Sequence, residues 1–599
     1  MAIPTDNLVG YWKLLGDSQD HSGSGNHGIN HGVDLDTSTF EGRGQHIEVP
    51  TSSSINPGHD DFSFCALLHT DQDVDDVHGD IVSKFNPDMR RGFNFSLMSS
   101  SGGYNSIGTD RRLAFGIDDG KDGAWKDCGK PSPTNVILFS LTVFEGSLYA
   151  SGSNVRSPQE ASHVYRYIGG DQWEDCGRLG FEPTQGVGGM VVHNGDLYGA
   201  TTNWYGASAP WSLKGVSSNW DVSLSALTDR PVEEALLQEA YGRVYRYLGN
   251  KEWEDCGQPG ENPRLTSLAS YRGQLYALGP DDGAPYRSRA YVYEGNQEWI
   301  ACGEFTNRGF PMAVHDGRLF MAHKGEPAID DETGGARVHA FDGEQWEDLG
   351  NPLGTHARCN EIHSLGVFGG AIHIGTNPLG RVVKLEDGQW HDTGELGDSR
   401  EVTALAAYNG CFYGGTLLWA DVYRQERESR WQLMQRFLDE DVDPGSLAGR
   451  VPGILIPRDW VSDWALTSSL TVFGGELFAS TSSCWDGYRS DQGSRGRVYR
   501  FRAGQNAAYD RDMGPGWKHV VAVKSGRRLE IFVNGLKVGT SGPFDPADYD
   551  LSTDHPLRLG SGEVDSLSGR MREVRFYKRA LDQREVTSIH HESLSARDH

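Results

Sequence analysis

The motif Trp173-Glu-Asp-Cys-Gly177 returns along the middle of the chain and decides the fold. With at most two changes it occurs again as Trp125-Lys-Asp-Cys-Gly129, Trp253-Glu-Asp-Cys-Gly257, Trp299-Ile-Ala-Cys-Gly303, Trp346-Glu-Asp-Leu-Gly350 and Trp390-His-Asp-Thr-Gly394, with a degenerate copy at Trp431. Successive tryptophans are 48, 80, 46, 47, 44 and 41 residues apart. A spacing of roughly 40–50 residues indicates one repeated unit, and the interval of 80 indicates a unit that carries an insertion.

Each repeat also contains a hairpin pattern. An apolar run ends in a turn and a second apolar strand follows at once, as in Leu268-Ala-Ser-Tyr-Arg-Gly273 and Leu275-Tyr-Ala277. Seven such runs end at Gly146, Gly195, Gly273, Gly317, Gly370, Gly410 and Gly475. The first tryptophan motif precedes the first hairpin, while the last third strand, Val498-Tyr-Arg-Phe501, has no motif after it. Pairing these two ends closes a ring, so we predict a seven-bladed β-propeller over residues 125–504.

The two flanks, residues 1–124 and 505–599, lack the repeat. They contain Leu8-Val-Gly-Tyr-Trp-Lys-Leu14, Asp20-His-Ser-Gly-Ser-Gly-Asn-His-Gly28, Trp517-Lys-His-Val-Val-Ala-Val523, Leu529-Glu-Ile-Phe-Val-Asn-Gly535 and Met571-Arg-Glu-Val-Arg-Phe-Tyr-Lys-Arg-Ala-Leu581. These stretches, in this order, resemble the laminin-G-like, concanavalin-A-like jelly rolls. Neither flank supplies a whole jelly roll. We therefore predict an all-β chain in which the propeller is inserted into a discontinuous laminin-G-like β-sandwich.

The composition of the chain excludes some classes of binding partner. The chain has 55 Lys and Arg against 83 Asp and Glu, a net charge of −28 that repels nucleic-acid phosphates. No apolar run approaches the ~18 residues that a membrane-spanning helix needs. We therefore expect neither nucleic acid nor membrane insertion. The start, Met1-Ala-Ile-Pro-Thr-Asp6, has no signal-peptide pattern. The location stays open: secreted or periplasmic if a leader has been removed, and otherwise cytoplasmic.

The cysteines fit a repeat better than a set of disulfides. Cys128, Cys176, Cys256 and Cys302 occupy the same place in four motifs, and outer strands of different blades lie too far apart for disulfide geometry. The other four cysteines show no metal-ligand spacing. We expect all eight cysteines to be reduced, with the four repeat thiols buried as small apolar groups.

The jelly-roll resemblance also implies a metal. In that family the first Asp of the glycine-rich loop, here Asp20, often binds a structural calcium ion together with loop carbonyls. Oxygen ligands on a flexible loop suit Ca²⁺. The alternative is that Asp20 caps a turn. No other cofactor is indicated.

One histidine departs from the repeat. His193 and His315 fall where other blades have Phe or Tyr, which favours packing roles. His363 instead lies near the start of a first strand, where the other repeats have Phe139, Gly188, Thr266, Phe310, Thr403 and Ser468. Glu361 precedes it, and Arg264 and Arg308 lie at comparable places in other repeats. Because first strands of a propeller begin near the central channel, these four residues form a candidate catalytic group, with a proton-transfer histidine and an arginine anion clamp. A solvated funnel is the alternative.

Long connections are expected on the same face. Their aromatic and basic residues could stack on sugar rings and bind anionic groups, or could only anchor the connections by packing. The candidate substrate-binding residues are Trp204, Tyr205, Arg358, Trp460, Trp464, Trp485, Tyr488 and Arg489.

The propeller with a central His and Arg set resembles those of polysaccharide lyases, which cleave uronate-containing glycans by β-elimination. This resemblance implies a polysaccharide or oligosaccharide substrate, with the jelly roll as an accessory module. Two alternatives stay open. One is a glycoside hydrolase that uses paired carboxylates, for example Glu361 with Asp459. The other is a non-catalytic protein that binds glycans or other partners.

Overall fold

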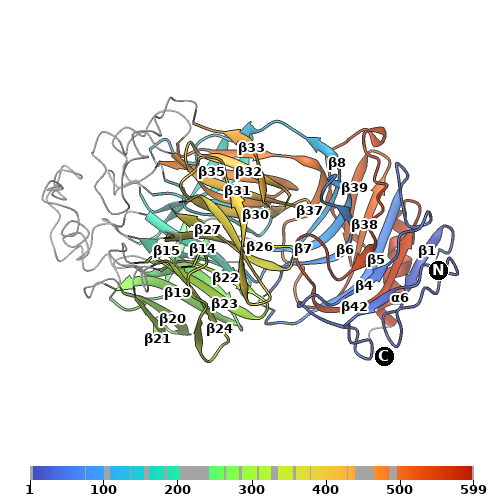
Figure 1. Cartoon of the computed structure of the whole chain (residues 1–599), viewed down its shortest axis with the longest axis horizontal. Coiled ribbons are helices and arrows are strands. Elements are labelled where there is room, and N and C mark those ends of the chain that lie inside the picture. The colour runs from blue at the N-terminus through green and yellow to red at the C-terminus, as the bar shows by residue number, and fades with distance from the viewer. Residues whose placement is uncertain are drawn as a thin grey trace, which may run out of the picture.

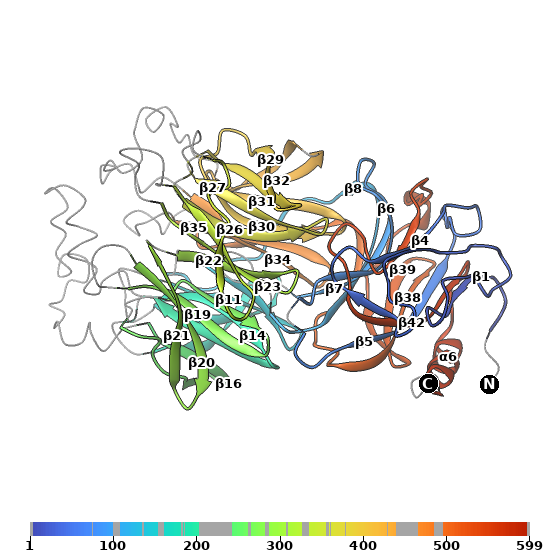
Figure 2. The ribbon, with the colours of Figure 1, turned by 60° about the horizontal axis from the view of Figure 1, so that its bottom comes forward.

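The chain folds into a β-sandwich and a ring of small sheets, which lie at opposite ends of the molecule (Figures 1 and 2). The computed structural model describes residues 4–595, apart from residues 75, 100–107, 135–136, 154–160, 181–183, 185, 203–241, 262–264, 282–286, 307–308, 326–334, 355–358, 360, 378, 428, 439–464 and 484–494. No helix within this described part is long and apolar enough to cross a membrane.

The sandwich contains two sheets, and each takes strands from both flanks. The first sheet has the order β1–β42–β5–β38–β39–β40, with β3 beside β42. Its strands are β1 (Leu8–Trp12), β3 (Thr39–Glu41), β5 (Phe62–Thr70), β38 (Gly516–Ser525), β39 (Arg528–Val533), β40 (Leu536–Thr540) and β42 (Ser568–Tyr577). The second sheet has the order β2–β4–β41–β6–β7–β8–β37. Its strands are β2 (Ile29–His31), β4 (His46–Val49), β6 (Gly79–Asn86), β7 (Arg91–Met98), β8 (Arg112–Asp122), β37 (Ala503–Tyr509) and β41 (Leu557–Leu559).

Alternating apolar residues from both sheets fill the sandwich core. Phe62 of β5 packs against Phe93 and Phe576, with ring centroids 4.6 and 5.7 Å away. These three rings are essentially inaccessible to solvent, as is Trp12. The N-terminal β5 pairs with the C-terminal β38 from Phe62–Lys524 to Thr70–Gly516. The two flanks therefore form one folded unit, and neither completes the core alone.

A helix covers the outer face of the first sheet. It is α6 (Gln583–Ser595), and its Val586 and Ile589 pack with Cys65, Val521 and Phe532 of the sheet. A single 3-10 turn, η1 (Pro546–Asp548), lies between β40 and β41.

The middle of the chain forms seven antiparallel units of four strands within the described residues. The first three blades are β10 (Leu141–Phe144), β11 (Ser147–Ser151), β12 (His163–Gly169), β13 (Gln172–Arg178); β14 (Gly186–His193), β15 (Asp196–Thr202), β16 (Val244–Gly249), β17 (Glu252–Asp255); and β18 (Ser267–Tyr271), β19 (Gln274–Asp281), β20 (Arg287–Gly295), β21 (Glu298–Thr306). Blades four and five are β22 (Gly309–His315), β23 (Arg318–His323), β24 (Arg337–Phe341), β25 (Trp346–Asp348); and β26 (Glu361–Phe368), β27 (Ala371–Asn377), β28 (Arg381–Glu386), β29 (Gln389–Glu395). Blades six and seven are β30 (Val402–Tyr408), β31 (Cys411–Leu418), β32 (Asp421–Arg427), β33 (Arg430–Arg436); and β34 (Ala465–Phe473), β35 (Glu476–Ser483), β36 (Val498–Phe501), β9 (Lys126–Asp127).

These units close into a seven-bladed propeller. Each first strand contacts the first strand of the next blade, in the order β10, β14, β18, β22, β26, β30, β34 and back to β10. The seventh blade combines both ends of the repeat region, since β9 pairs with β36 through Asp127–Tyr499 and Lys126–Arg500. This is the closure that the order of the motifs predicts. Blades six and seven also share a short pairing between β31 and β34.

The Trp, Asp and Gly of the repeated motif each have a structural role. The indole Nε1 of Trp173 donates to the carbonyl of Cys128 in the preceding blade, at 2.8 Å. The same bond joins Trp253 to Cys176, Trp299 to Cys256, Trp346 to Cys302, Trp390 to Leu349 and Trp431 to Thr393. Within the motif, Asp175 Oδ1 accepts from the backbone of Gly177. Gly177 has φ +94°, and a Cβ there would meet the carbonyl of Lys251, so only glycine fits.

Three of the four repeat thiols are buried as expected. Cys128, Cys176 and Cys256 are buried, whereas Cys302 is only partly buried. The cysteines of the described residues, which leave out Cys484, are all unbonded to one another.

The hairpin turns between first and second strands meet the sandwich. Backbone N–H groups of Gly146 and Gly369 donate to the carbonyls of Asp510 and Glu563, both at 2.9 Å. Asn194 N donates to Thr109 Oγ1, and Gly474 N donates to Asp510 Oδ2. The sandwich therefore covers one entrance of the propeller, and the starts of the first strands lie toward the opposite face.

Candidate functional site

Two candidate residues lie at the start of β26, on the propeller face away from the sandwich. Glu361 begins this strand and His363 follows two residues later, whereas the strand's other end, at Phe368, leads into the turn that contacts the sandwich. Both side chains are buried, with only 8% and 6% of their residues' surfaces exposed. The fifth blade therefore holds this pair deep at the channel end of its first strand.

A carboxylate from the neighbouring blade fixes the ring of His363. Nδ1 of His363 donates to Oε1 of Glu401, the residue before β30, because a carboxylate can only accept. Asn377, at the end of β27, donates from Nδ2 to the other oxygen, Oε2 of Glu401, at 2.6 Å. Glu401 is itself only 5% exposed. This hydrogen bond makes Nδ1 a donor and turns Nε2 to the side of the ring away from Glu401.

The other edge of the histidine faces a second carboxylate. Nε2 of His363 lies 3.5 Å from Oε2 of Glu361, and Nζ of Lys324 forms an ion pair with Oε1 of the same residue. The ring of Phe310, from β22, packs edge-on against the imidazole with centroids 4.3 Å apart. Lys324, Glu361, His363 and Glu401 therefore form a row of interacting polar side chains across three blades.

This arrangement can perform proton transfer. A histidine oriented through Nδ1 by a carboxylate presents Nε2 for taking or giving a proton. Glu361 and Lys324 provide a second carboxylate and a cation beside that nitrogen. Among these four side chains Lys324 is the most exposed, with 37% of its side-chain surface accessible.

The sequence predicted part of this site. Glu361 and His363 lie close together, and His363 is buried and packed against Phe310. The predicted residues Arg264, Arg308, Arg358, Trp204, Tyr205, Trp460, Trp464, Trp485, Tyr488 and Arg489, and Asp459 of the hydrolase alternative, lie outside the described residues. Their roles stay predictions.

Sequence reasoning missed Glu401, Asn377 and Lys324. For Glu401 a signal exists, since it precedes Thr403 by two residues as Glu361 precedes His363. The two glutamates thus occupy one repeat position in adjacent blades, and Arg264 and Arg308 occupy it in the two preceding repeats. Lys324 follows β23 and Asn377 ends β27, both second strands, where no repeat pattern singles these residues out.

The structure gives Asp20 a turn-capping role. Its Oδ1 accepts from the backbone N–H groups of Tyr11 and Ser22, at 3.0 and 2.8 Å. Its Oδ2 accepts from Ser22 Oγ and from the backbone of Asn26, at 3.0 and 2.9 Å. Four donors occupy the lone pairs that a calcium ion would need, so this arrangement does not fit a calcium site on Asp20.

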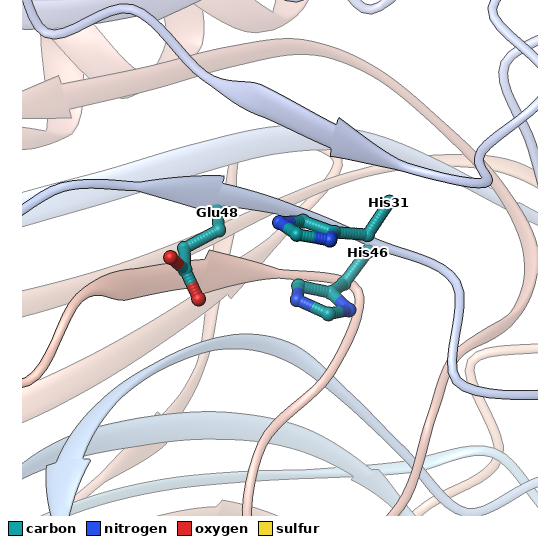
Figure 3. Close-up of side chains that lie close together, drawn as sticks. All are labelled: His31, His46 and Glu48. Carbon is teal, nitrogen blue, oxygen red and sulfur yellow. The ribbon is translucent and has the colours of Figure 1, made fainter.

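A histidine pair lies on the outer surface of the sandwich. His31 of β2 pairs directly with His46 of β4, and their rings stack with centroids 4.5 Å apart. Glu48 lies two residues along β4 on the same face (Figure 3). The Nδ1 of His46 donates to the Gly44 carbonyl at 2.9 Å, which leaves its Nε2 lone pair available. These three exposed or half-exposed residues, the surface triad, could bind a metal ion from solution.

Similarities to other proteins concern the fold. No curated protein matches the chain. Among solved structures, the extracellular domain of a one component system from B. thetaiotaomicron has 12% identity over 68% of this chain and 46% of its own, with a TM-score of 0.38. This chain thus spans less than half the length of that structure. An oligogalacturonate lyase from Vibrio parahaemolyticus shows 10% identity over 69% and 97%, with a TM-score of 0.37. Trypanosoma rangeli sialidase shows 12% identity over 76% and 93%, with a TM-score of 0.29.

A family model covers part of the chain. The concanavalin A-like lectin/glucanases superfamily matches residues 463–587, which is about a fifth of the chain. The matched range contains β34 to β36 of the last blade and then the C-terminal strands of the sandwich. The N-terminal strands of the same sandwich lie before the propeller and outside this range. The C-terminal region is therefore similar to this superfamily, in an all-β chain whose laminin-G-like sandwich is interrupted by a seven-bladed propeller.

Proposed function

We propose that this chain is a carbohydrate-active enzyme whose active centre lies at the propeller face away from the sandwich. The observation that supports it is the orientation of His363, whose Nδ1 is held by Glu401 while Nε2 lies beside Glu361. The proposal takes residues 125–504 as the catalytic propeller. Residues 1–124 and 505–599 form the accessory sandwich, whose similarity to a lectin and glucanase superfamily fits sugar binding.

The chemistry that fits this group best is β-elimination on a uronate-containing glycan. Nε2 of His363 would remove the proton at C5, next to the uronate carboxylate. The electron pair of the broken C–H bond forms the C4=C5 double bond as the C4–O bond breaks. The departing sugar oxygen takes a proton from water. Glu361, whose carboxylate pairs with Lys324, lies beside Nε2 and stabilises the protonated histidine that results.

Cations lower the barrier to such a reaction because they offset the charge of the uronate as C5 loses its proton. Lys324 stands beside the histidine through its ion pair with Glu361. Arg264 and Arg308 share the repeat position of Glu361, so we assign them to the substrate carboxylate. The aromatic residues Trp204, Tyr205, Trp460, Trp464, Trp485 and Tyr488, with Arg358 and Arg489, complete the proposed glycan-binding surface.

A glycan screen tests this proposal. The full chain is incubated with uronate-containing polysaccharides and, in parallel, with neutral ones, while ultraviolet absorbance and reducing ends are measured together. An elimination gives both signals on uronate polymers only, and His363→Ala should lower the rate by ~10²–10⁴ per folded molecule. Reducing ends without absorbance would instead identify a hydrolase, and glycan binding with neither signal would identify a non-catalytic protein.

A further inference from the structure

The strongest unassigned feature of the molecule is a buried cluster where the propeller meets the sandwich. It combines Asp76, from the connection between β5 and β6, Asp565, from the connection between β41 and β42, and His315, the last residue of β22. One ligand atom from each lies within 4.8 Å of the others. The three residues are 8%, 1% and 8% exposed. We call them the interface cluster.

Each aspartate accepts a backbone hydrogen bond with one carboxylate oxygen, and its other oxygen accepts none among the described residues. Asp76 Oδ2 accepts from the backbone of Asp316 at 2.9 Å, and Asp565 Oδ1 accepts from the backbone of Ser566 at 2.7 Å. Asp76 Oδ1, Asp565 Oδ2 and His315 Nδ1 have no hydrogen-bond partner among the described residues. Two of these atoms, His315 Nδ1 and Asp565 Oδ2, lie at ion-pair distance from each other, 3.3 Å. Three inaccessible polar atoms that converge without a hydrogen bond are expected to share a ligand, because buried polar groups are normally satisfied.

Other acidic groups lie close to the cluster. Asp80 is fully buried and accepts a hydrogen bond from the backbone of Asp565. Glu563 precedes Asp565 by two residues. A bound cation would offset the negative charge of these carboxylates.

We propose that Asp76, His315 and Asp565 bind a divalent transition-metal ion that joins the propeller to the sandwich. Imidazole with two carboxylates is a ligand set for Zn²⁺ or Mn²⁺ rather than for Ca²⁺. His315 Nδ1 and Asp565 Oδ2 are 3.3 Å apart. That separation matches the edge of a tetrahedron with metal–ligand bonds of about 2.0–2.1 Å, which is the Zn²⁺ geometry. A water molecule would be the fourth ligand.

The position of the interface cluster indicates what the ion would do. Its ligands come from three segments far apart in sequence, and the propeller contributes one of them through the end of a first strand. The metal-loaded chain should therefore resist separation of its two parts better than the metal-free chain, because an ion that binds only the folded, docked state stabilises that state. This role is independent of the proposed glycan chemistry, which lies at the other face.

The test uses the full chain, stripped with EDTA and dialysed against Zn²⁺, and measures bound metal and thermal unfolding. We expect one tightly bound Zn²⁺ per chain and a higher melting temperature on adding it. Asp565→Asn keeps the shape of the side chain, and His315→Phe places there the residue found at this repeat position in Phe144, Phe368 and Phe473. Each should weaken binding by ~100-fold or more, since losing even a supporting neighbour of a metal ligand costs ~10–100-fold.

The surface triad supplies the matched control. The double variant His31→Ala/His46→Ala should keep the tight site and the rise in melting temperature. Bound Co²⁺ gives a second readout, because its visible absorption should change in Asp565→Asn and not in the double variant. The proposal is overturned if the stripped chain binds no stoichiometric Zn²⁺. It is also overturned if tight binding survives Asp565→Asn and disappears with the surface triad.

Discussion

Nδ1 of His363 donates to the carboxylate of Glu401 across the boundary between the fifth and sixth blades. The next residue along β26, Ser364, makes a second bond across the same boundary, from Oγ to the carbonyl of Val402 at 2.8 Å. The orientation of the histidine therefore depends on the docking of two blades rather than on either blade alone. This relationship makes Glu401 the residue that positions the proposed base.

Glu401→Gln should lower kcat on a glycan substrate by at least ~10-fold, with a smaller change in KM. The amide keeps the size of the side chain but removes the negative charge that stabilises the protonated histidine. The pH profile of kcat should therefore move to lower pH. Glu395→Gln is the control, because Glu395 is an exposed residue of β29 paired with Arg381. An unchanged pH profile in Glu401→Gln would contradict this positioning role.

His363→Ala should also destabilise the fold, by about 2–4 kcal/mol. The substitution empties the space beside Phe310 and leaves the buried carboxylate of Glu401 without its donor. Urea unfolding measures the loss. The double variant His363→Ala/Glu401→Ala should be less destabilised than the sum of the two single variants, since removing the carboxylate removes the unpaired charge. Additive losses would show that the two residues are not coupled.

The sequence predicted the fold because its signals are local and repeated. The tryptophan motif marks the fourth strands, and the six motif tryptophans from Trp173 to Trp431 each bond to the preceding blade, as Trp173 does to Cys128. The closing strand could be predicted for the same reason, since an unpaired motif at Trp125 and an unpaired strand at Val498 leave one way to complete the ring.

The sites were harder to predict because their residues meet only in the folded chain. Glu401 shares a repeat position with Glu361, so comparing repeats at that position could have found it. Asp76 and Asp565 belong to no repeat, and their contact with His315 depends on docking of the sandwich. The packing role expected for His315 from its aromatic repeat position is therefore incomplete.

Two other buried histidines should make the chain sensitive to acid. Burial lowers the pKa values of His193 and His373 to about 4, against 6.5 in an unfolded chain. Below pH 6.5 the unfolded state binds more protons, so their stabilising contribution is present above pH 6.5 and is lost as the pH falls toward 4. Each contributes at most about 3 kcal/mol.

Replacing each histidine with the residue that other blades carry at the same repeat position tests its effect on acid stability. His193→Phe and His373→Tyr install the aromatic residues that sister blades carry, such as Phe144 and Tyr149. Each variant should lose less stability than the wild type between pH 6.5 and 4 in urea unfolding. His391→Gln, at an exposed position of β29, should follow the wild-type curve. Parallel curves for all four proteins would show that these histidines do not control acid unfolding.

A last prediction concerns the junction between propeller and sandwich. Gly116, in β8 of the sandwich, lies against the hairpin turn of the sixth blade, where Asn409 Nδ2 donates to the carbonyl of Ala503 at 3.0 Å. A Cβ on Gly116 would overlap the side-chain oxygen of Asn409 and come within 2.5 Å of that of Asn506. Gly116→Ala should therefore lower the free energy of unfolding by about 1–3 kcal/mol, as overpacking does in cores.

Gly542→Ala, where the nearest atom lies 3.6 Å away on Arg502, is the control and should be neutral or slightly stabilising. Thermal unfolding measures both, and limited proteolysis should cut Gly116→Ala faster if the junction loosens. Equal melting temperatures for the two variants would mean that the turn of Asn409 can move away from the sandwich at little cost.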